Sequence, residues 1–155
     1  MEKITVLDIA DFFLSKKSLT HKKVQKLVYY AYAWFIALYN QDEDNIENVL
    51  FKEQPEAWIH GPVFPTLYKK YKTYSWSEIA QKREKSFKSE DLQAFLEAIW
   101  NKFGSYSADQ LECMTHQEDP WINARKNMRE DNPSKEKISL KDIFAYYNSL
   151  IDEKW

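Results

Sequence analysis

The sequence contains few of the residues that build disulfide frameworks, metal sites or phosphate-binding loops. Its 155 residues include one cysteine, Cys113, three histidines and only two glycines. A single cysteine excludes an intramolecular disulfide framework, and the histidines have neither zinc-finger nor HExxH spacing. A glycine-rich loop that could cradle a phosphate is also missing. We therefore expect no cofactor, no metal site and no catalytic residues, and we interpret the chain as a binding protein and not as an enzyme.

Long apolar runs and a strong net charge are missing too. No run approaches the roughly 18 residues of a membrane helix, and the first residues lack the basic-then-apolar order of a signal peptide. The formal net charge of −2 gives no strong field that would attract nucleic acid or an acidic membrane. We expect a cytoplasmic protein without a membrane partner, for which nucleic acid is a weak candidate.

Aromatic residues, in contrast, are abundant. They make up 16% of the chain and include ten tyrosines and six tryptophans, more than a core of this size usually needs. At this length we expect one domain that spans residues 1–155. Most rings should lie in its core, but tryptophan and tyrosine are also favoured interface anchors. Both roles therefore stay open for six rings: Trp58, Trp76, Trp121, Tyr29, Tyr30 and Tyr32.

Helical periodicity and capping residues predict most of the secondary structure. Apolar residues recur at helical spacing in residues 6–14, after Thr5 as the capping residue. The segment after Thr20 is apolar or aromatic on almost every face from Leu27 onward, which is typical of a central helix that others surround. Four further helices are predicted from their boundary residues: Ser89 with Gly104 as a left-handed C-terminal residue, the capping box of Ser107 and Gln110, Asp119 as N-cap with Pro120 at the first helical position, and Ser139.

A small β-ribbon is predicted between these helices. Two short apolar runs, residues 49–51 and 57–59, are separated by Pro55 and polar residues, which suits two short strands. Gly61 and Pro62 follow the second run, where glycine permits a close approach and proline fixes φ as the chain turns toward a helix. A rigid corner and a partner-binding edge are both compatible with this pattern. The expected fold class is a compact, mainly α domain with a central buried helix and a two-stranded ribbon.

Lysines gather at the start of the predicted central helix, where the helix macrodipole disfavours positive charge. Lys22, Lys23 and Lys26 are the members within the helix. A solvated face is one explanation, and a surface for an acidic protein partner is the next, with nucleic acid third. Neutralising the three lysines should then change partner binding more than the melting temperature.

Four stretches together resemble the Panacea domain, also called the SocA-like antitoxin domain, which is found in phage-associated proteins. They are "LTHKKVQKLVYYAYAWFIAL", "EAWIHGPVFPTLYKKYK", "LECMTHQEDPW" and the final "IFAYY" helix. The resemblance extends over nearly the whole chain. It places the family motif on thirteen positions: Thr20, Gln25, Lys26, Tyr29, Tyr30, Trp58, Gly61, Pro62, Val63, Thr115, His116, Pro120 and Trp121.

The resemblance implies the antitoxin of a type II toxin–antitoxin system, which neutralises a cognate protein toxin by direct contact. One branch of the family acts as a proteolytic adaptor that delivers its toxin to the ClpXP protease. A DNA-binding autorepressor of its own operon, or another phage-associated protein-binding module, is the alternative. The residues that we expect at the partner interface are Lys22, Lys23, Lys26, Tyr30, Trp58, His60, Gly61 and Pro62.

Overall fold

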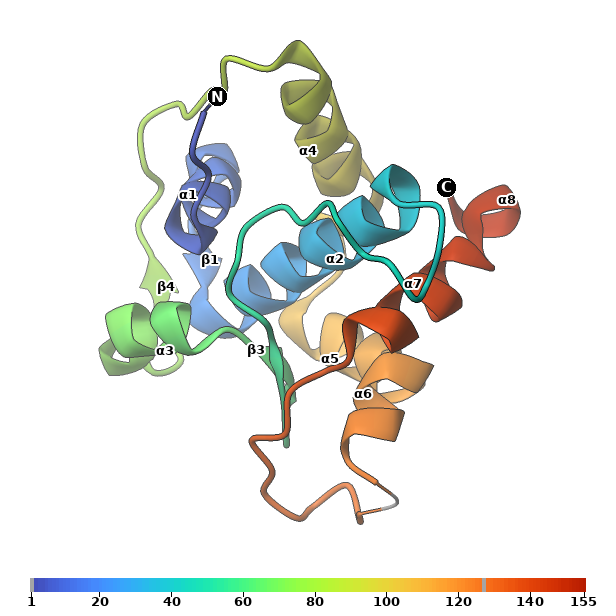
Figure 1. The fold of residues 1–155 in the computed structure, drawn as a ribbon. Helices are drawn as coiled ribbons and strands as arrows, with labels where there is room; N and C mark the ends of the chain where they lie inside the picture. The colour runs from blue at the N-terminus through green and yellow to red at the C-terminus, as the bar shows by residue number, and fades with distance from the viewer. Residues whose placement is uncertain (1, 127) are drawn as a thin grey trace.

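A computed structural model describes residues 2–126 and 128–155 and has the mainly α-helical fold that the sequence predicts (Figure 1). No helix within these residues is long and apolar enough to cross a membrane. The helices are α1 (Val6–Lys16), α2 (His21–Tyr39), α3 (Pro65–Tyr71), the short 3₁₀ helix η1 (Lys72–Tyr74), α4 (Glu90–Phe103), α5 (Ala108–His116), α6 (Asp119–Ala124), α7 (Leu140–Asn148) and α8 (Ile151–Lys154).

Helix α2 is the centre of the fold. It begins after Thr20, whose side chain accepts a hydrogen bond from the Lys23 amide at 3.2 Å. Fourteen of its 19 residues are buried, and α1, α3, α4, α5 and α7 all contact it. Figure 1 shows α2 running through the middle of the molecule, with the other helices around it. The predicted central buried helix is confirmed.

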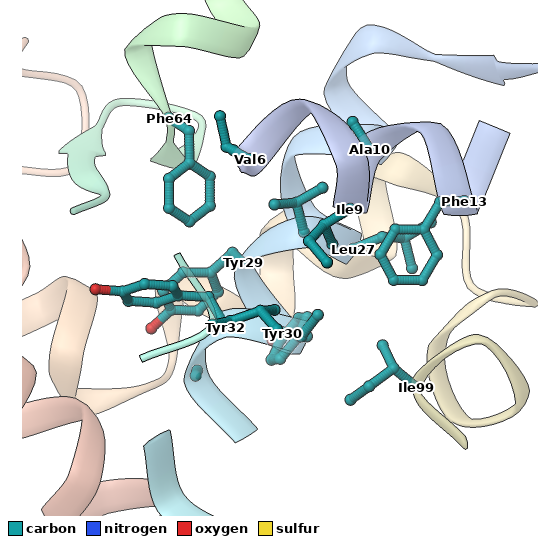
Figure 2. Packing of buried hydrophobic residues seen from close by; sticks show 14 of the residues in the cluster. Val6, Ile9, Ala10, Phe13, Leu27, Tyr29, Tyr30, Tyr32, Phe64 and Ile99 are labelled. Carbon is teal, nitrogen blue, oxygen red and sulfur yellow. The ribbon is translucent and has the colours of Figure 1, made fainter. Parts of the chain in front are cut away.

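The core is built from apolar side chains that converge on α2. In Figure 2, Ile9, Ala10 and Phe13 of α1 lie on one side of the helix, and Ile99 extends from α4 toward the same cluster. Full burial of each large apolar side chain stabilises the fold by roughly 1.5–3 kcal/mol. The rings of Tyr29, Tyr30 and Tyr32 are each only 1% exposed. Most of the aromatic excess of α2 therefore belongs to the core.

In residues 2–126 and 128–155 the strands form two small antiparallel ribbons, where the sequence predicts one. Strand β1 (Leu19–Thr20) pairs with β4 (Glu78–Ile79), a pairing that the sequence analysis missed. Strand β2 (Glu56–Trp58) pairs with β3 (Gly61–Val63), with Trp58 opposite Gly61. The β2–β3 hairpin replaces the predicted ribbon of 49–51 with 57–59. Leu50 and Phe51 are buried in a bend, so their apolar character reflects packing into the core and not strand pairing.

Most of the predicted helix starts are confirmed. Thr5 and Ser107 each form a full capping box, and Ser89 and Ser139 each accept a hydrogen bond from the backbone of the first turn. Helix α6 begins one residue earlier than predicted, because Glu118 is its N-cap and Pro120 stands at the second helical position.

The predicted left-handed conformation of Gly104 is wrong. Its φ of −64° and ψ of −24° are those of an ordinary right-handed residue. A Cβ atom at this position would lie 2.7 Å from ring atoms of Trp100. Close packing against that indole, and not backbone chirality, is the reason for a glycine at the end of α4.

Candidate functional site

Side chains of α2 hold the second strand of the β2–β3 hairpin. The Phe64 amide donates to Gln25 Oε1 at 2.8 Å, and Gln25 Nε2 donates to the Phe64 carbonyl at 3.3 Å. One residue further along α2, Lys26 Nζ donates to the Pro62 carbonyl at 3.1 Å. Buried backbone groups must find hydrogen-bond partners. Gln25 and Lys26 thus replace the neighbouring strand that β3 lacks on this side.

The first strand of the hairpin is held from the other side. Trp121 Nε1 on α6 donates to the Trp58 carbonyl at 2.8 Å, and Arg125 Nη1 donates to the Ala57 carbonyl at 3.1 Å. The Ala57 amide donates to the carbonyl of Glu136 at 2.7 Å. Sequence reasoning missed Arg125, since no motif distinguishes a lysine or arginine that is buried from one on the surface.

Gly61 stands where a side chain would not fit. Its φ is +110°, a conformation that L-residues rarely adopt. An added Cβ would lie 2.6 Å from Lys26 Cε and 3.0 Å from Thr115 Oγ1. Both the backbone conformation and the close approach of α2 and α5 therefore require glycine. These features support the interpretation of this segment as a rigid corner. Gly61 and Pro62, however, begin strand β3 instead of following the second strand.

The lysine cluster at the start of α2 is not a fully exposed patch, although a solvated face, an acidic partner and nucleic acid were all considered on that assumption. Lys26 is only 1% exposed. Burial lowers the pKa of its ammonium group from 10.5 to about 7, and Lys22 lowers it further, whereas Glu112 opposes the change. The aliphatic stem and ammonium group of Lys26 are part of the interior and not of an exposed patch, and its place in a partner interface stays a prediction.

The two remaining lysines are half-buried and have partners. Lys22 Nζ lies 2.8 Å from Asp109 Oδ1 and also forms an ion pair with Glu112, and both acids are on α5. Lys23 Nζ donates to the Gly104 carbonyl at 2.7 Å, just beyond the end of α4. The acidic side chains of α5 and the carbonyl at the end of α4 thus offset the unfavourable interaction of these two lysines with the macrodipole of α2.

A second buried polar cluster joins α2, α6 and α7. The hydroxyls of Tyr30 and Tyr147 donate to the same oxygen of Glu118, at 2.9 and 2.7 Å, and the Tyr29 and Tyr147 hydroxyl oxygens lie 3.2 Å apart. Burial raises the pKa of Glu118 to about 7, while hydrogen bonds from Tyr147 and Tyr30 act in the opposite direction. Tyr29 and Tyr30 are therefore scaffold residues in this structure.

The expected interface residues divide by burial into two groups. Four are buried, namely Lys26, Tyr30, Gly61 and Pro62, and four reach the surface at least in part, namely Lys22, Lys23, Trp58 and His60. The remaining motif positions are interior or nearly so. Thr20 caps α2, and the half-buried His116 stacks on Trp121 with ring centroids 4.0 Å apart. The other members, all buried, are Gln25, Tyr29, Val63, Thr115, Pro120 and Trp121.

An open groove of about 630 Å³ lies beside the hairpin and is lined by residues of the start of α2, β3, α3, η1 and the start of α5. Its walls include Trp58, Tyr68 and Trp76, and Lys26 contributes to its lining. The Trp58 and Tyr68 ring centroids are 4.8 Å apart. Trp76 is 79% exposed. The groove collects the exposed aromatic surface next to the hairpin and is the candidate functional site.

The groove contains no ready-made metal site. No group of three or more histidine, cysteine, aspartate or glutamate side chains in the described ranges could hold a metal ion. The nearest arrangement centres on Glu112, with His60 Nδ1 at 3.1 Å and His116 Nε2 at 3.9 Å. Lys22 also pairs with this carboxylate, so its negative charge is already offset by a cation of the chain.

Comparison with known proteins identifies a family. The model of a family described as antitoxin SocA-like, Panacea domain, matches residues 24–122 of the chain. The matched range runs from the first turn of α2 through the hairpin and into α6. No curated protein and no solved structure matches the chain in the two other comparisons. The resemblance seen in the sequence motifs is thereby confirmed over this range.

The hairpin geometry predicts that Gly61→Ala is strongly destabilising. The substitution forces a side chain into a positive-φ conformation, which costs about 1–3 kcal/mol, and also pushes on Lys26 and Thr115. We expect a loss of at least ~2 kcal/mol in the free energy of unfolding, measured by urea denaturation. His60→Ala, at the exposed adjacent position, is the control and should change it by less than about 0.5 kcal/mol. Similar stabilities of the two variants would contradict this account.

The burial of Lys26 predicts a pH-dependent stability. The pKa of Lys26 falls from 10.5 to about 7 on folding, so between these values the unfolded chain binds the proton more tightly. The free energy of unfolding should rise with pH over this window, by at most about 1.4 kcal/mol per pH unit from this group. Lys26→Met should remove that contribution. Urea denaturation of both proteins at pH 7, 8 and 9 measures it, and parallel pH profiles would refute it.

Proposed function

Because the chain belongs to the SocA-like antitoxin family with its Panacea domain, we propose that it is the antitoxin of a type II toxin–antitoxin system and neutralises a protein toxin by direct binding. The observation that carries the proposal is the family match over residues 24–122. The groove beside the hairpin supports it, because exposed tryptophan and tyrosine side chains are favoured anchors at protein interfaces.

We further propose that the protein acts by binding and not by catalysis. Burial brings the pKa values of two groups to about 7: the pKa of Lys26 is lowered and that of Glu118 is raised. Perturbed pKa values often mark active sites, but structural networks perturb them as well. Lys26 donates to a backbone carbonyl of β3, and Glu118 accepts from two tyrosines of neighbouring helices. Both groups thus have a structural use that accounts for their burial.

Two outcomes for the bound toxin are compatible with this function. The antitoxin could block its toxin in a stable complex, or it could act as an adaptor that delivers the toxin to ClpXP. Direct contact with the toxin is common to both, so the same groove serves either outcome. The fate of the toxin after binding separates them.

The proposal predicts toxicity of a neighbouring gene and rescue by this protein. The gene adjacent to the one that encodes this chain should stop growth when expressed alone in a bacterial host, and coexpression of this chain should restore growth. The two products should copurify. A stable complex with unchanged toxin levels indicates sequestration, whereas loss of the toxin only in cells with ClpXP indicates the adaptor role.

An unrelated protein expressed at the same level is the control for rescue. Absence of toxicity, or toxicity that this chain does not relieve, would count against an antitoxin. Binding to the promoter of its own operon, with a steep loss of affinity as salt is added, would instead favour the autorepressor.

A further inference from the structure

The groove beside the hairpin combines exposed rings with cations that lack acidic partners. Lys72 of η1 lies on its wall and is exposed, and no ion pair of Lys72 occurs in residues 2–126 and 128–155. Asp109 is the one acidic residue among those lining the groove in the described chain, and Lys22 already holds it at 2.8 Å. The groove is therefore locally cationic, although the whole chain has a net charge of −2.

The interior side of the groove has unused hydrogen-bond donors. The ammonium group of Lys26 carries three N–H groups, and its one hydrogen bond in the described structure goes to the Pro62 carbonyl. Lys26 lines the groove while being only 1% exposed. With a pKa of about 7 the group is only partly protonated at neutral pH, and a carboxylate that approaches it at this depth favours its charged form.

The outer side of the groove has rings that are placed for contact. Trp76 is 79% exposed and Tyr68 is 38% exposed. The residue before Trp76, Ser75, has a φ of +53°, which turns the chain sharply between η1 and β4. Large rings left in water along a groove provide apolar area that an inserted side chain would cover.

We propose that this groove binds an extended segment of a protein partner in which an aspartate or glutamate lies close to a large apolar side chain. The apolar side chain packs among Trp58, Tyr68 and Trp76, and the carboxylate is drawn to Lys72 and toward Lys26. The identification of that partner as a toxin rests on the proposed function, but the chemistry of the segment does not.

A peptide segment fits these charges better than a nucleic acid does. A nucleic acid presents a row of phosphates and needs several cations along its path. Here Asp109 lies on the α5 side of the groove, and Asp109 and Glu112 both pair with Lys22. One or two carboxylates beside an apolar side chain match the few free cations, whereas a row of phosphates would run past these acids.

The test uses the full chain, immobilised, and a library of random dodecapeptides displayed on phage. Enriched peptides should share an acidic residue within two positions of tryptophan, phenylalanine or leucine. A synthetic copy of the best peptide should bind at least about tenfold more weakly to Lys72→Glu and to Trp76→Ala than to the wild type. Replacing its acidic residue by alanine should cause a loss of the same order.

Matched substitutions outside the groove serve as controls. Lys52→Glu makes the same charge change at another exposed lysine, and Ile122→Ala truncates an exposed apolar side chain on α6. Both should bind the peptide within twofold of the wild type, and all four variants should keep the wild-type melting temperature, because their side chains are exposed. Equal loss in test and control variants would overturn the proposal.

Other outcomes of the selection are also decisive. No enrichment, or enriched peptides without an acidic residue, would overturn the proposal. So would a fluorescein-labelled single-stranded oligonucleotide that binds the wild type and is lost in Trp76→Ala, because the groove would then hold nucleic acid. Toxin rescue is measured separately. Peptide binding without growth rescue rejects the antitoxin role alone, whereas growth rescue without peptide binding rejects the proposed peptide site alone.

Discussion

The β2–β3 hairpin depends on hydrogen bonds from α2 to the backbone of β3. An isolated two-stranded hairpin is marginally stable in water. Gln25 closes a reciprocal pair with Phe64, and Lys26 satisfies the Pro62 carbonyl, so the central helix acts as a third strand. Because α2 also contributes more buried core residues than any other helix of the described chain, the position of the hairpin is fixed by the same element that fixes the helices.

This arrangement explains why an unfavourable residue is found in the interior. A buried ammonium group is costly, and the lowered pKa of Lys26 measures that cost. Leaving the Pro62 carbonyl without a partner would also cost about 1–3 kcal/mol. The absence of a side chain at Gly61 leaves the space through which the Lys26 stem reaches the carbonyl. The lysine at position 26 therefore depends on the glycine at position 61.

Features that depend on neighbouring residues could be predicted from the sequence, whereas features that depend on contacts between distant residues could not. Thr5, Ser89, Ser107 and Ser139 act on their own first turns, so helix starts could be predicted from a few neighbouring residues. The strand partner of 56–58 could not, because an apolar run at 49–51 matches the strand pattern equally well. Nor could the burial of Lys26, since its contact with Pro62 spans 36 residues. Of the groove-lining residues, Lys22, Lys26, Trp58 and His60 were expected at an interface, whereas Tyr68 and Lys72 were missed for the same reason.

The division between inner and outer residues has a consequence for recognition. The hairpin is fastened from within, by Gln25, Lys26 and Trp121, whereas the groove is lined on its outer side by Trp76 and Lys72. Substitutions of exposed side chains usually change stability by less than about 0.5 kcal/mol. The outer residues can therefore change with little effect on the hairpin behind them. Such a scaffold would allow the proposed binding surface to be adapted to another partner without a new fold.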